Sequence, residues 1–327
     1  MIFSTVLDNL NRLPLPIPFP DGPVNAYLAE SEPLTLIDCG TRTDASYDAL
    51  VESLSTKGYK VSDIQRLLIT HHHSDHLGLA ERIVEESGAE VWAHPLDVPW
   101  LETPDVAREQ LEQFTDTLFK EGDVPMAVIE TMKTVNRYLF TLAGATHVTR
   151  TIAEGDNINL AGLGWQVYHT PGHAGDLICL YQPDTRVLLA SDHLLRDISS
   201  NPLIEAPAQH GDPRPRPLLD YLREMQRIAA LDIEIAYGGH GEPITNVRDL
   251  VESRVTFHHE RAEKLLSLFD GRPRTLYELT LMMFPKVEDA RKYLALSEVL
   301  GHIDLLEQEG RIGCEMRHGI VYWYPLR

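Results

Sequence analysis

Cysteine is scarce in this chain of 327 residues. The three cysteines, Cys39, Cys179 and Cys314, are far apart and odd in number. No pair has the Cys-x-x-Cys spacing of a thiolate zinc site, and an odd number does not suit a disulfide framework. We therefore expect three reduced thiols. Cys39 and Cys179 lie in apolar, strand-like segments, where a thiol fills core space as a small hydrophobic group.

Apolar runs long enough to span a membrane are also absent. The N-terminal residues, MIFSTVLDNLNRLPLPIPF, lack the basic start and the apolar stretch of a secretory signal. No window approaches the ~20 apolar residues that a membrane helix needs. We therefore expect a cytoplasmic protein without a membrane partner.

Basic residues are too few to balance the acidic ones. The chain has 29 Lys and Arg against 49 Asp and Glu, a formal net charge of −20. Residues 251–327 hold 11 basic and 12 acidic residues, so nearly all of the excess, −19, lies in residues 1–250. A surface this acidic repels phosphate backbones at long range. A nucleic-acid partner is therefore disfavoured, and a small-molecule substrate is expected.

Apolar, strand-like segments alternate with helices in the first part of the chain. Strands are expected at 24–29, 34–38, 66–70 and 89–94, with helices at 44–57 and 75–87. This alternation predicts an α/β layered fold. Further strands are expected at 158–170, 177–182, 187–191 and 233–237, with a Pro-rich loop at 197–217 and a helix at 218–230.

Residues 97–147 interrupt the strands with two helical stripes. Apolar side chains recur at spacings of three and four residues from Ala107 to Leu118 and again from Val128 to Leu142. The two stripes, joined around 122–125, predict an inserted helical hairpin. The hairpin would be a lid or one wall of an apolar substrate pocket, or its stripe would belong to the ordinary core. The pattern leaves both interpretations open.

The character of the chain changes again near residue 248. A long helix at 248–269 is followed by helices at 275–285 and 297–310 and by two short strands. Two helices followed by a hairpin are typical of a winged helix. We therefore divide the chain into a catalytic domain, 1–247, and a winged-helix-like domain, 248–327. The near-neutral charge of the second domain favours packing or homodimerisation over nucleic-acid binding.

A cluster of metal-binding residue types follows the strand at 66–70. The segment THHHSDH supplies four candidate ligands: His71, His73, Asp75 and His76. Neutral imidazole and carboxylate groups suit Zn²⁺, Mn²⁺ or Fe. In extended backbone, His71 and His73 lie on one side and His72 points away from them. Asp75 and His76, at the start of a helix, would face a second ion.

Three later segments each place a candidate ligand directly after a strand, at His173, Asp192 and His240. Glycine precedes both histidines, in PGH and GGHG, and lets the backbone approach an ion closely. Each segment alone is a weak signal. Together with the first cluster they form a pattern that chance rarely produces.

In their order along the chain, the HxHxDH motif and the later His, Asp and His resemble the metallo-β-lactamase superfamily. The resemblance implies an αββα sandwich with two divalent metal ions, Zn²⁺ in the first place and Mn²⁺ or Fe as alternatives. Metal 1 would be bound by His71, His73 and His173, metal 2 by Asp75, His76 and His240, and both by Asp192. Asp38, in LIDCG, would support a ligand histidine from behind, with a plain turn-forming Asp as the alternative.

A closer resemblance is to superfamily hydrolases with a C-terminal winged helix, the β-lactamase-like protein 2 and glyoxalase II-like group. It rests on TPGHAGDLICLY, LLASDHLL, YGGHGEPI and VTFHHERAEKLLSLF and covers nearly the whole chain except 97–147. Relatives use the stretch equivalent to 16–24 near the site. We find no basic cluster for glutathione contacts in the C-terminal part, so a glutathione thioester is disfavoured.

The chemistry that the resemblance implies is hydrolysis. Two close cations lower the pKa of a shared water from about 15.7 towards about 7, and the resulting bridging hydroxide would attack a small-molecule thioester, lactone or ester. Asp75 is the candidate proton acceptor. His193 is a candidate acid, although a packed or solvated histidine is the favoured interpretation. The alternatives are a metal-dependent nuclease acting on RNA or another phosphodiester and, less favoured, an iron-dependent redox enzyme or a regulator on the same fold.

Four further histidines are interpreted without a role in the site. His94 and His169 lie in strand-like segments and are expected to be structural. His258 and His259 lie on the helix at 248–269, where we expect a solvated face.

Overall fold

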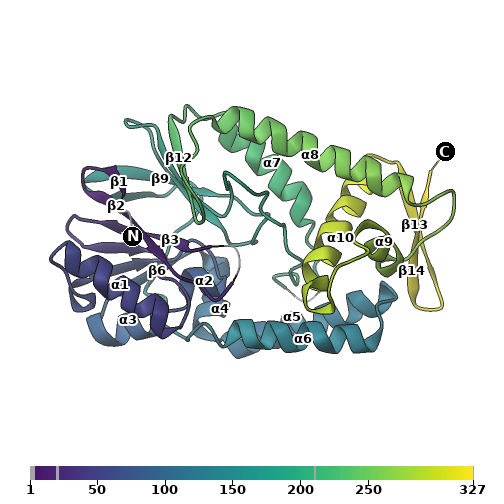
Figure 1. The fold of residues 1–327 in the computed structure, drawn as a ribbon, viewed down its shortest axis with the longest axis horizontal. Coiled ribbons are helices and arrows are strands. Elements are labelled where there is room, and N and C mark those ends of the chain that lie inside the picture. The colour runs from purple at the N-terminus through teal and green to yellow at the C-terminus, as the bar shows by residue number, and fades with distance from the viewer. Residues whose placement is uncertain (1–3, 20–21, 210, 327) are drawn as a thin grey trace.

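Two β-sheets face each other in the half of the molecule that holds the N-terminus (Figure 1). The structure, a computed structural model, describes residues 4–19, 22–209 and 211–326. The first sheet has seven strands in chain order: β1 (Ser4–Leu7), β2 (Leu10–Leu15), β3 (Val24–Ala29), β4 (Thr35–Ile37), β5 (Arg66–Leu68), β6 (Glu90–Ala93) and β7 (Arg150–Thr151). The second has the order β12–β11–β10–β9–β8: β8 (Asn157–Leu160), β9 (Leu163–His169), β10 (Ile178–Gln182), β11 (Val187–Ser191) and β12 (Ile235–Gly238).

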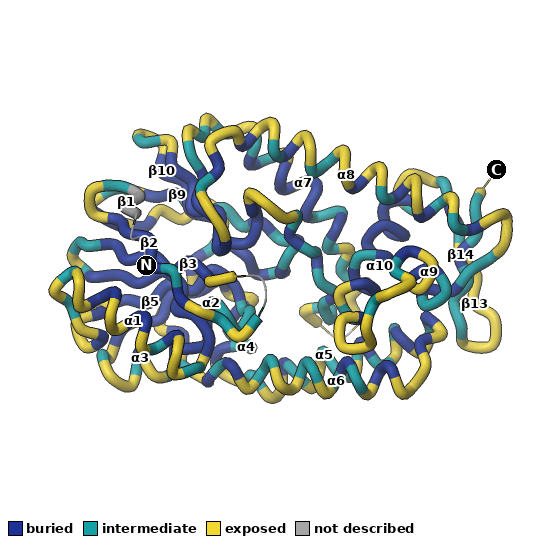
Figure 2. The backbone as a smooth tube through the Cα atoms, in the orientation of Figure 1, coloured by how far each residue is buried: buried dark blue, intermediate teal, exposed yellow. Residues whose placement is uncertain are grey.

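The two-residue period of the strands explains the layers. In β10, Ile178 and Leu180 pack between the sheets, whereas Cys179 and Tyr181 point to the opposite face and pack towards helices. Figure 2 shows the strands of both sheets largely buried. Burial on both faces explains why these strands appear in the sequence as continuous apolar runs.

Helices cover the outer face of each sheet. The first sheet shares a core with α1 (Asp44–Thr56) and α3 (Ala80–Ser87), and the second shares one with α7 (Pro217–Ala229) and α8 (Val247–Ser267). Thr43 caps α1, because its Oγ1 accepts a hydrogen bond from the backbone N–H of Ser46 at 3.2 Å. The result is the αββα order of layers that the resemblance implied.

The prediction of one helix at 75–87 is wrong. A short helix, α2 (Ser74–Leu77), ends before Gly78, and α3 begins at Ala80. Backbone bonds to a neighbouring loop replace the helical ones, because Cys39 N–H donates to the carbonyl of His76 at 2.8 Å and Leu79 N–H donates to that of Gly40 at 3.3 Å. This tertiary contact interrupts the helix immediately after the metal-binding motif.

The predicted helical hairpin is present between β6 and β7. It comprises α4 (Val98–Glu102), α5 (Pro104–Glu121) and α6 (Met126–Phe140). Part of its apolar stripe is ordinary core, since Phe119, Ile129 and Met132 are buried. The turn between α5 and α6 reaches the C-terminal part of the chain, where Tyr277 N–H donates to the carbonyl of Gly122 at 3.0 Å. Figure 1 shows the hairpin extending from the sheets towards that part.

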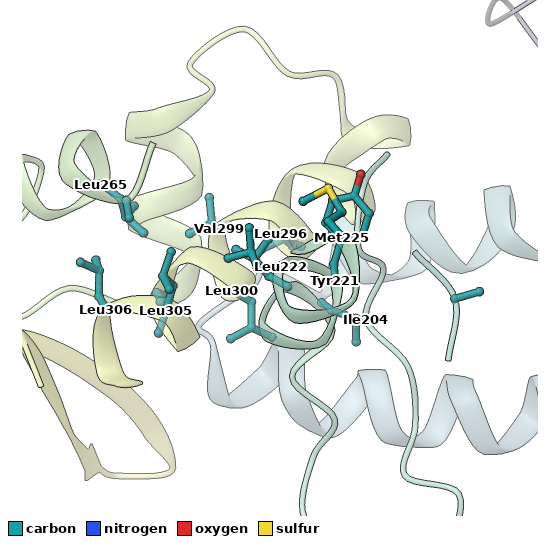
Figure 3. Close-up of a cluster of buried hydrophobic side chains, with 14 of the residues drawn as sticks. Ile204, Tyr221, Leu222, Met225, Leu265, Leu296, Val299, Leu300, Leu305 and Leu306 are labelled. Carbon is teal, nitrogen blue, oxygen red and sulfur yellow. The ribbon is translucent and has the colours of Figure 1, made fainter. Parts of the chain in front are cut away.

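The C-terminal part contains α9 (Leu276–Met283), α10 (Lys292–Gln308) and a two-stranded antiparallel sheet of β13 (Ile312–Arg317) and β14 (Ile320–Pro325). Leu296, Val299 and Leu300 of α10 pack in one cluster with Tyr221 and Leu222 of α7 (Figure 3). α10 begins at Lys292, earlier than the predicted 297. The helical region and the small sheet are as predicted, and the assignment to the winged-helix class stays a prediction.

Three short 3-10 helices are also described: η1 (Val61–Asp63), η2 (Pro95–Asp97) and η3 (Asp289–Arg291). None of the described helices is long and apolar enough to cross a membrane. Cys39 and Cys179 are buried, Cys314 is exposed, and all three thiols are free, as predicted.

The prediction of a solvated face is wrong for His258, which is only 3% exposed. His302 Nδ1 lies 2.6 Å from the carbonyl oxygen of Glu298, His258 Nδ1 lies 3.3 Å from His302 Nε2, and Ser199 Oγ lies 3.2 Å from His258 Nε2. Because a carbonyl only accepts, His302 Nδ1 is the donor to Glu298. The lowered pKa values of both rings keep them neutral, so His302 Nε2 accepts from His258 Nδ1 and His258 Nε2 accepts from Ser199 Oγ. The two rings connect the loop after β11 to α8 and α10.

Acid should destabilise the protein through this histidine pair. Burial is the largest cause that lowers the pKa of His258 to about 3 and that of His302 to about 4, from an ordinary 6.5. The nearby charges of Arg254 and Arg261 also lower the pKa of His258. Below 6.5 the unfolded chain binds protons that the folded chain does not. The contribution of these neutral rings to the free energy of unfolding is therefore complete above pH 6.5 and is lost as the pH falls. The loss is about 2 kcal/mol for each imidazole between about pH 7.5 and about pH 5.

Urea unfolding at the two pH values checks this prediction. The variant His258→Gln removes one of the two titrating rings, so its loss of unfolding free energy on acidification should be about 2 kcal/mol smaller than that of the wild type. Other buried histidines contribute equally to both proteins and cancel in the comparison. Equal losses of unfolding free energy in the wild type and in His258→Gln would contradict the assignment of His258 as a buried, neutral imidazole.

Candidate metal centre

The predicted site residues meet at one edge of the sandwich. Strands β4 and β5 are parallel, as are β11 and β12, so the carboxyl ends of each pair lie together. The loops after β5, β9, β11 and β12, together with the short helix α2, carry the seven candidate ligands: His71, His73, Asp75, His76, His173, Asp192 and His240. Side chains from positions up to 169 residues apart thus face a common centre.

Three imidazoles form the first group. His71 Nε2 lies 3.0 Å from His73 Nδ1, and His173 Nε2 lies 2.9 Å from the same atom. Burial lowers the pKa of His71 and of His73 well below the ordinary value, and the neighbouring imidazoles lower it further. The two rings are therefore neutral at physiological pH, which is the form that binds a metal.

A carboxylate and two imidazoles form the second group. Asp75 Oδ2 lies 3.2 Å from His240 Nε2 and 4.0 Å from His76 Nε2. Burial acts to raise the pKa of Asp75, but His76 and His240 outweigh it and lower the pKa to about 2. Asp75 is therefore ionised at neutral pH and can act as an anionic ligand or accept a proton.

Asp192 lies between the two groups. Its Oδ1 is 3.5 Å from His76 Nε2, and its Oδ2 is 3.5 Å from His173 Nε2 and 3.6 Å from His240 Nε2. A Cβ on Gly239 would lie 2.2 Å from Asp192 Oδ1, so only glycine lets the loop after β12 approach this carboxylate. The glycine thus permits close approach to a candidate ligand, and the expected approach to an ion stays a prediction.

The donor set fits bound cations. His76 Nε2 and Asp192 Oδ1 are buried without a hydrogen-bond partner, which costs free energy unless a ligand satisfies them. Although burial disfavours the charged ring, three carboxylates raise the pKa of His76 well above its ordinary value. The centre therefore attracts positive charge. His71, His73 and His173 can together hold a metal ion, as can Asp75, His76 and His240.

Asp38 contacts the centre from behind. Its Oδ1 accepts from Thr70 N–H at 2.9 Å, and its Oδ2 accepts from Thr70 Oγ1 and from His76 Nδ1, each at 2.8 Å. The carboxylate thus holds His76 with its Nε2 towards the centre. Asp38 has a φ of 57°, a left-handed conformation that suits Asp or Asn. The alternative interpretation, in which Asp38 only forms a turn, does not account for these hydrogen bonds.

His173 and His240 are also held through their second ring nitrogen. His173 Nδ1 lies 2.8 Å from Ser200 Oγ and 3.0 Å from the carbonyl of Asn201, and His240 Nδ1 lies 3.2 Å from the carbonyl of Pro23. Such contacts fix the orientation of a ligand ring. Ser200 and Asn201 lie in the Pro-rich loop, whose sequence carries no signal for this contact.

His72 lies outside both groups, as expected from its position in the motif. Its Nδ1 is 2.6 Å from Asp176 Oδ2, and its ring stacks on Trp100 with centroids 4.4 Å apart. Trp100 in turn is stacked with Phe140, with ring planes 3° apart. Sequence reasoning missed Asp176 and Trp100, because neither belongs to a recognisable motif.

Three histidines outside the two groups, His193, His94 and His169, are packed against other rings. His193 is fully buried, meets the Tyr221 ring edge-on at 5.6 Å between centroids, and does not line the cavity described below. Burial lowers its pKa to about 3. These observations favour a packing role over that of an acid. His94 and His169 stack on each other with centroids 4.2 Å apart, as expected of structural residues.

A cavity of about 370 Å³ adjoins the centre. One wall is made by side chains of the centre: His73, Asp75, His173, Asp192 and His240. Most of the remaining lining is apolar and includes Ile17 and Phe19 from the Pro-rich stretch 16–24, of which residues 20 and 21 lie outside the described part. Trp100, Leu111, Leu139 and Phe140 of the helical hairpin also line it, so the hairpin is a cavity wall as well as core.

Comparisons with known proteins agree with this geometry. The family model described as the metallo-beta-lactamase superfamily matches residues 19–240. The chain is 36% identical over 314 residues to a probable metallo-hydrolase, YqjP, of Bacillus subtilis, which covers 96% of this chain and 97% of the relative. It is 23% identical to a beta-lactamase-like protein 2 homolog of Drosophila melanogaster, over 88% of this chain and 83% of that protein.

A solved structure has the same fold over almost the whole chain. A metallo-beta-lactamase family protein from Thermus thermophilus superposes with a TM-score of 0.83 at 30% identity, covering 98% of this chain and 100% of that one. The expected resemblance is thereby confirmed. With its HxHxDH motif, its αββα layers and its convergent His and Asp side chains, the chain belongs to the metallo-beta-lactamase superfamily.

Proposed function

We propose that this protein is a two-metal hydrolase that cleaves a small-molecule thioester, lactone or ester. One observation supports the proposal above the others. Five of the seven candidate ligands form one wall of a largely apolar cavity, and among the described residues that line it there is no lysine or arginine. A cavity of this kind suits an uncharged organic substrate held with its reacting carbonyl against the metal centre.

Two groups of residues would hold the metals. One ion would be bound by His71, His73 and His173 and the other by Asp75, His76 and His240, with Asp192 between them. Zn²⁺ is the favoured metal, and Mn²⁺ and Fe are alternatives with the same ligand types. Bound ions would lower the pKa of water and polarise the carbonyl of the substrate.

The chain's own residues supply the rest of the mechanism. Asp75, ionised and facing the cavity, accepts a proton from the attacking water. Asp38 holds His76, and Ser200 holds His173, so the centre is oriented before the substrate binds. The apolar walls exclude bulk water and strengthen the electrostatic interactions at the centre.

A metal-dependent nuclease is the main alternative. Phosphodiester substrates bring negative charges that cationic side chains normally neutralise. The cavity lining offers no such side chain in the described residues, and the whole chain carries a net charge of −20. These features favour a neutral substrate over RNA. Iron absorbance of the purified protein would instead favour a redox enzyme.

The remaining expectations stand as proposals. Three free thiols fit a reducing compartment, and we propose the cytoplasm. We also retain residues 248–327 as a winged-helix-like domain. Tyr293 and Leu294 of that part line the cavity, which supports a packing role for it rather than nucleic-acid binding.

A substrate panel tests the proposal. The Zn²⁺- or Mn²⁺-loaded enzyme should turn over members of a set of acyl thioesters, lactones and aryl esters, and should leave a phosphodiester, single-stranded RNA and a nitrocefin-type β-lactam intact. Turnover should require the metal and disappear on chelation. Cleavage of RNA or the phosphodiester with the same metal requirement would move the assignment to a nuclease.

A further inference from the structure

We propose that the cavity binds a neutral, aliphatic acyl chain of about eight to twelve carbons, so that the substrates are medium-chain acyl esters or thioesters. This inference rests on the proposed hydrolase function and names the substrate class of the same site. Its support comes from the walls, the size and the charge of the cavity.

Besides Ile17 and Phe19, three segments that are distant in sequence supply the apolar walls. Trp100, Leu139 and Phe140 come from the helical hairpin, Ile198 and Leu203 from the loop after β11, and Leu294 from α10. The stacked rings of His72, Trp100 and Phe140 all line the cavity, which makes this wall rigid. A preformed apolar wall binds hydrocarbon without the cost of ordering side chains.

The cavity has room for a chain of this length. Its volume of about 370 Å³ corresponds to about twelve groups of the size of a water molecule, at roughly 30 Å³ each. A methylene group is of similar size. Part of the space next to the ligands must hold the reacting carbonyl, and the rest accommodates the chain.

The charge of the lining excludes an acidic tail. Away from the metal centre, Glu205 is the acidic side chain among the described lining residues; burial raises its pKa to about 7, and its Oε1 accepts from Gly175 N–H at 2.8 Å. His72, which also lines the cavity, already has a carboxylate partner, since its Nδ1 lies 2.6 Å from Asp176 Oδ2. No described lysine or arginine lines the cavity to neutralise a carboxylate or phosphate. Burying an anion without a partner is strongly unfavourable. An uncharged chain is therefore the occupant that the lining fits.

Hydrolysis of a homologous series measures the chain-length preference. We would use N-acetylcysteamine thioesters with acyl chains from two to sixteen carbons and the metal-loaded enzyme. kcat/KM should rise about fourfold per methylene up to eight to twelve carbons and then level off or fall. A matched ten-carbon chain that ends in a carboxylate should lose about 100-fold relative to decanoyl.

A cavity-filling variant tests the location. Leu139→Trp should shorten the preferred chain by several carbons, because Leu139 lines the cavity. Tyr138→Trp adds the same ring at the neighbouring position, which is 55% exposed and outside the described lining, and should leave the preference unchanged. If the preferred acyl-chain length changes equally in both variants, or changes in neither, the inference is overturned.

Binding separates this inference from the proposed function. Calorimetry with non-hydrolysable thioether analogues of the same lengths should show affinity that rises about fourfold per methylene, whether or not turnover occurs. If the thioethers bind in this way and no thioester or ester is cleaved, the hydrolase proposal fails and the acyl cavity stands. If thioesters are cleaved with a flat chain-length profile and the thioethers bind equally at all lengths, the acyl cavity is wrong and the hydrolase stands.

Discussion

Asp75→Asn should lower kcat/KM for the best substrate of the panel by about 10³-fold while leaving the fold intact. The amide has the same shape as the carboxylate, and Asp75 is a partly exposed residue at the cavity, so packing changes little. What is lost is the negative charge 3.2 Å from His240 Nε2 and the ability to accept a proton. Both losses act on the transition state.

The effect of Asp75→Asn should appear mainly in kcat. Asp75 lies in the wall of the cavity where the proposed substrate would place its reacting carbonyl, whereas the rest of that substrate would contact apolar side chains. Asp105→Asn is the matched control, since that carboxylate has 89% of its side chain exposed and lies on α5 away from the site. Full activity of Asp75→Asn in a protein that retains its metal would remove Asp75 from the mechanism.

The metal-binding motif could be predicted because its chemistry is local in the chain. His71, His73 and His76 lie within six residues, and the strand that precedes them is a clear apolar run. The later ligands could be matched because each follows a strand, and parallel neighbouring strands bring such positions to one edge. What the sequence could not supply was the outcome of tertiary contacts.

The wrong predictions for the helix after the motif and for His258 both involve a distant partner. The helix after the motif ends early because Cys39 and Gly40 bond to its backbone. His258 is buried by Ser199 and His302, which lie 59 and 44 residues away. Asp176, which holds His72, and the loop residue Ser200, which holds His173, belong to no motif. Helical periodicity and spacing carry no information on such pairs, so they were found only in the structure.

Asp38→Asn should weaken metal binding about 10- to 100-fold. The carboxylate of Asp38 accepts three hydrogen bonds, two from Thr70 and one from His76 Nδ1. Asparagine tolerates the left-handed backbone at this position, so the main chain is not strained. In either orientation of its amide, however, the NH₂ group faces a donor of Thr70 or His76 in place of an acceptor oxygen, so at least one of the three hydrogen bonds is lost. The negative charge beside His76 Nδ1, which holds this ring with its Nε2 towards the centre, is lost in both orientations.

Competition with a zinc-binding dye measures this affinity directly, without an activity assay. Asp304→Asn provides the comparison, because Asp304 is also a buried carboxylate, and its Oδ2 accepts from Arg214 Nη1 at 2.9 Å. Among the described residues, Asp304 belongs to none of the groups that could hold a metal, so Asp304→Asn should keep wild-type metal affinity even if the protein is less stable. Equal weakening in the two variants would mean that any buried carboxylate matters equally. A loss confined to Asp38→Asn would show that Asp38 acts through the orientation of His76.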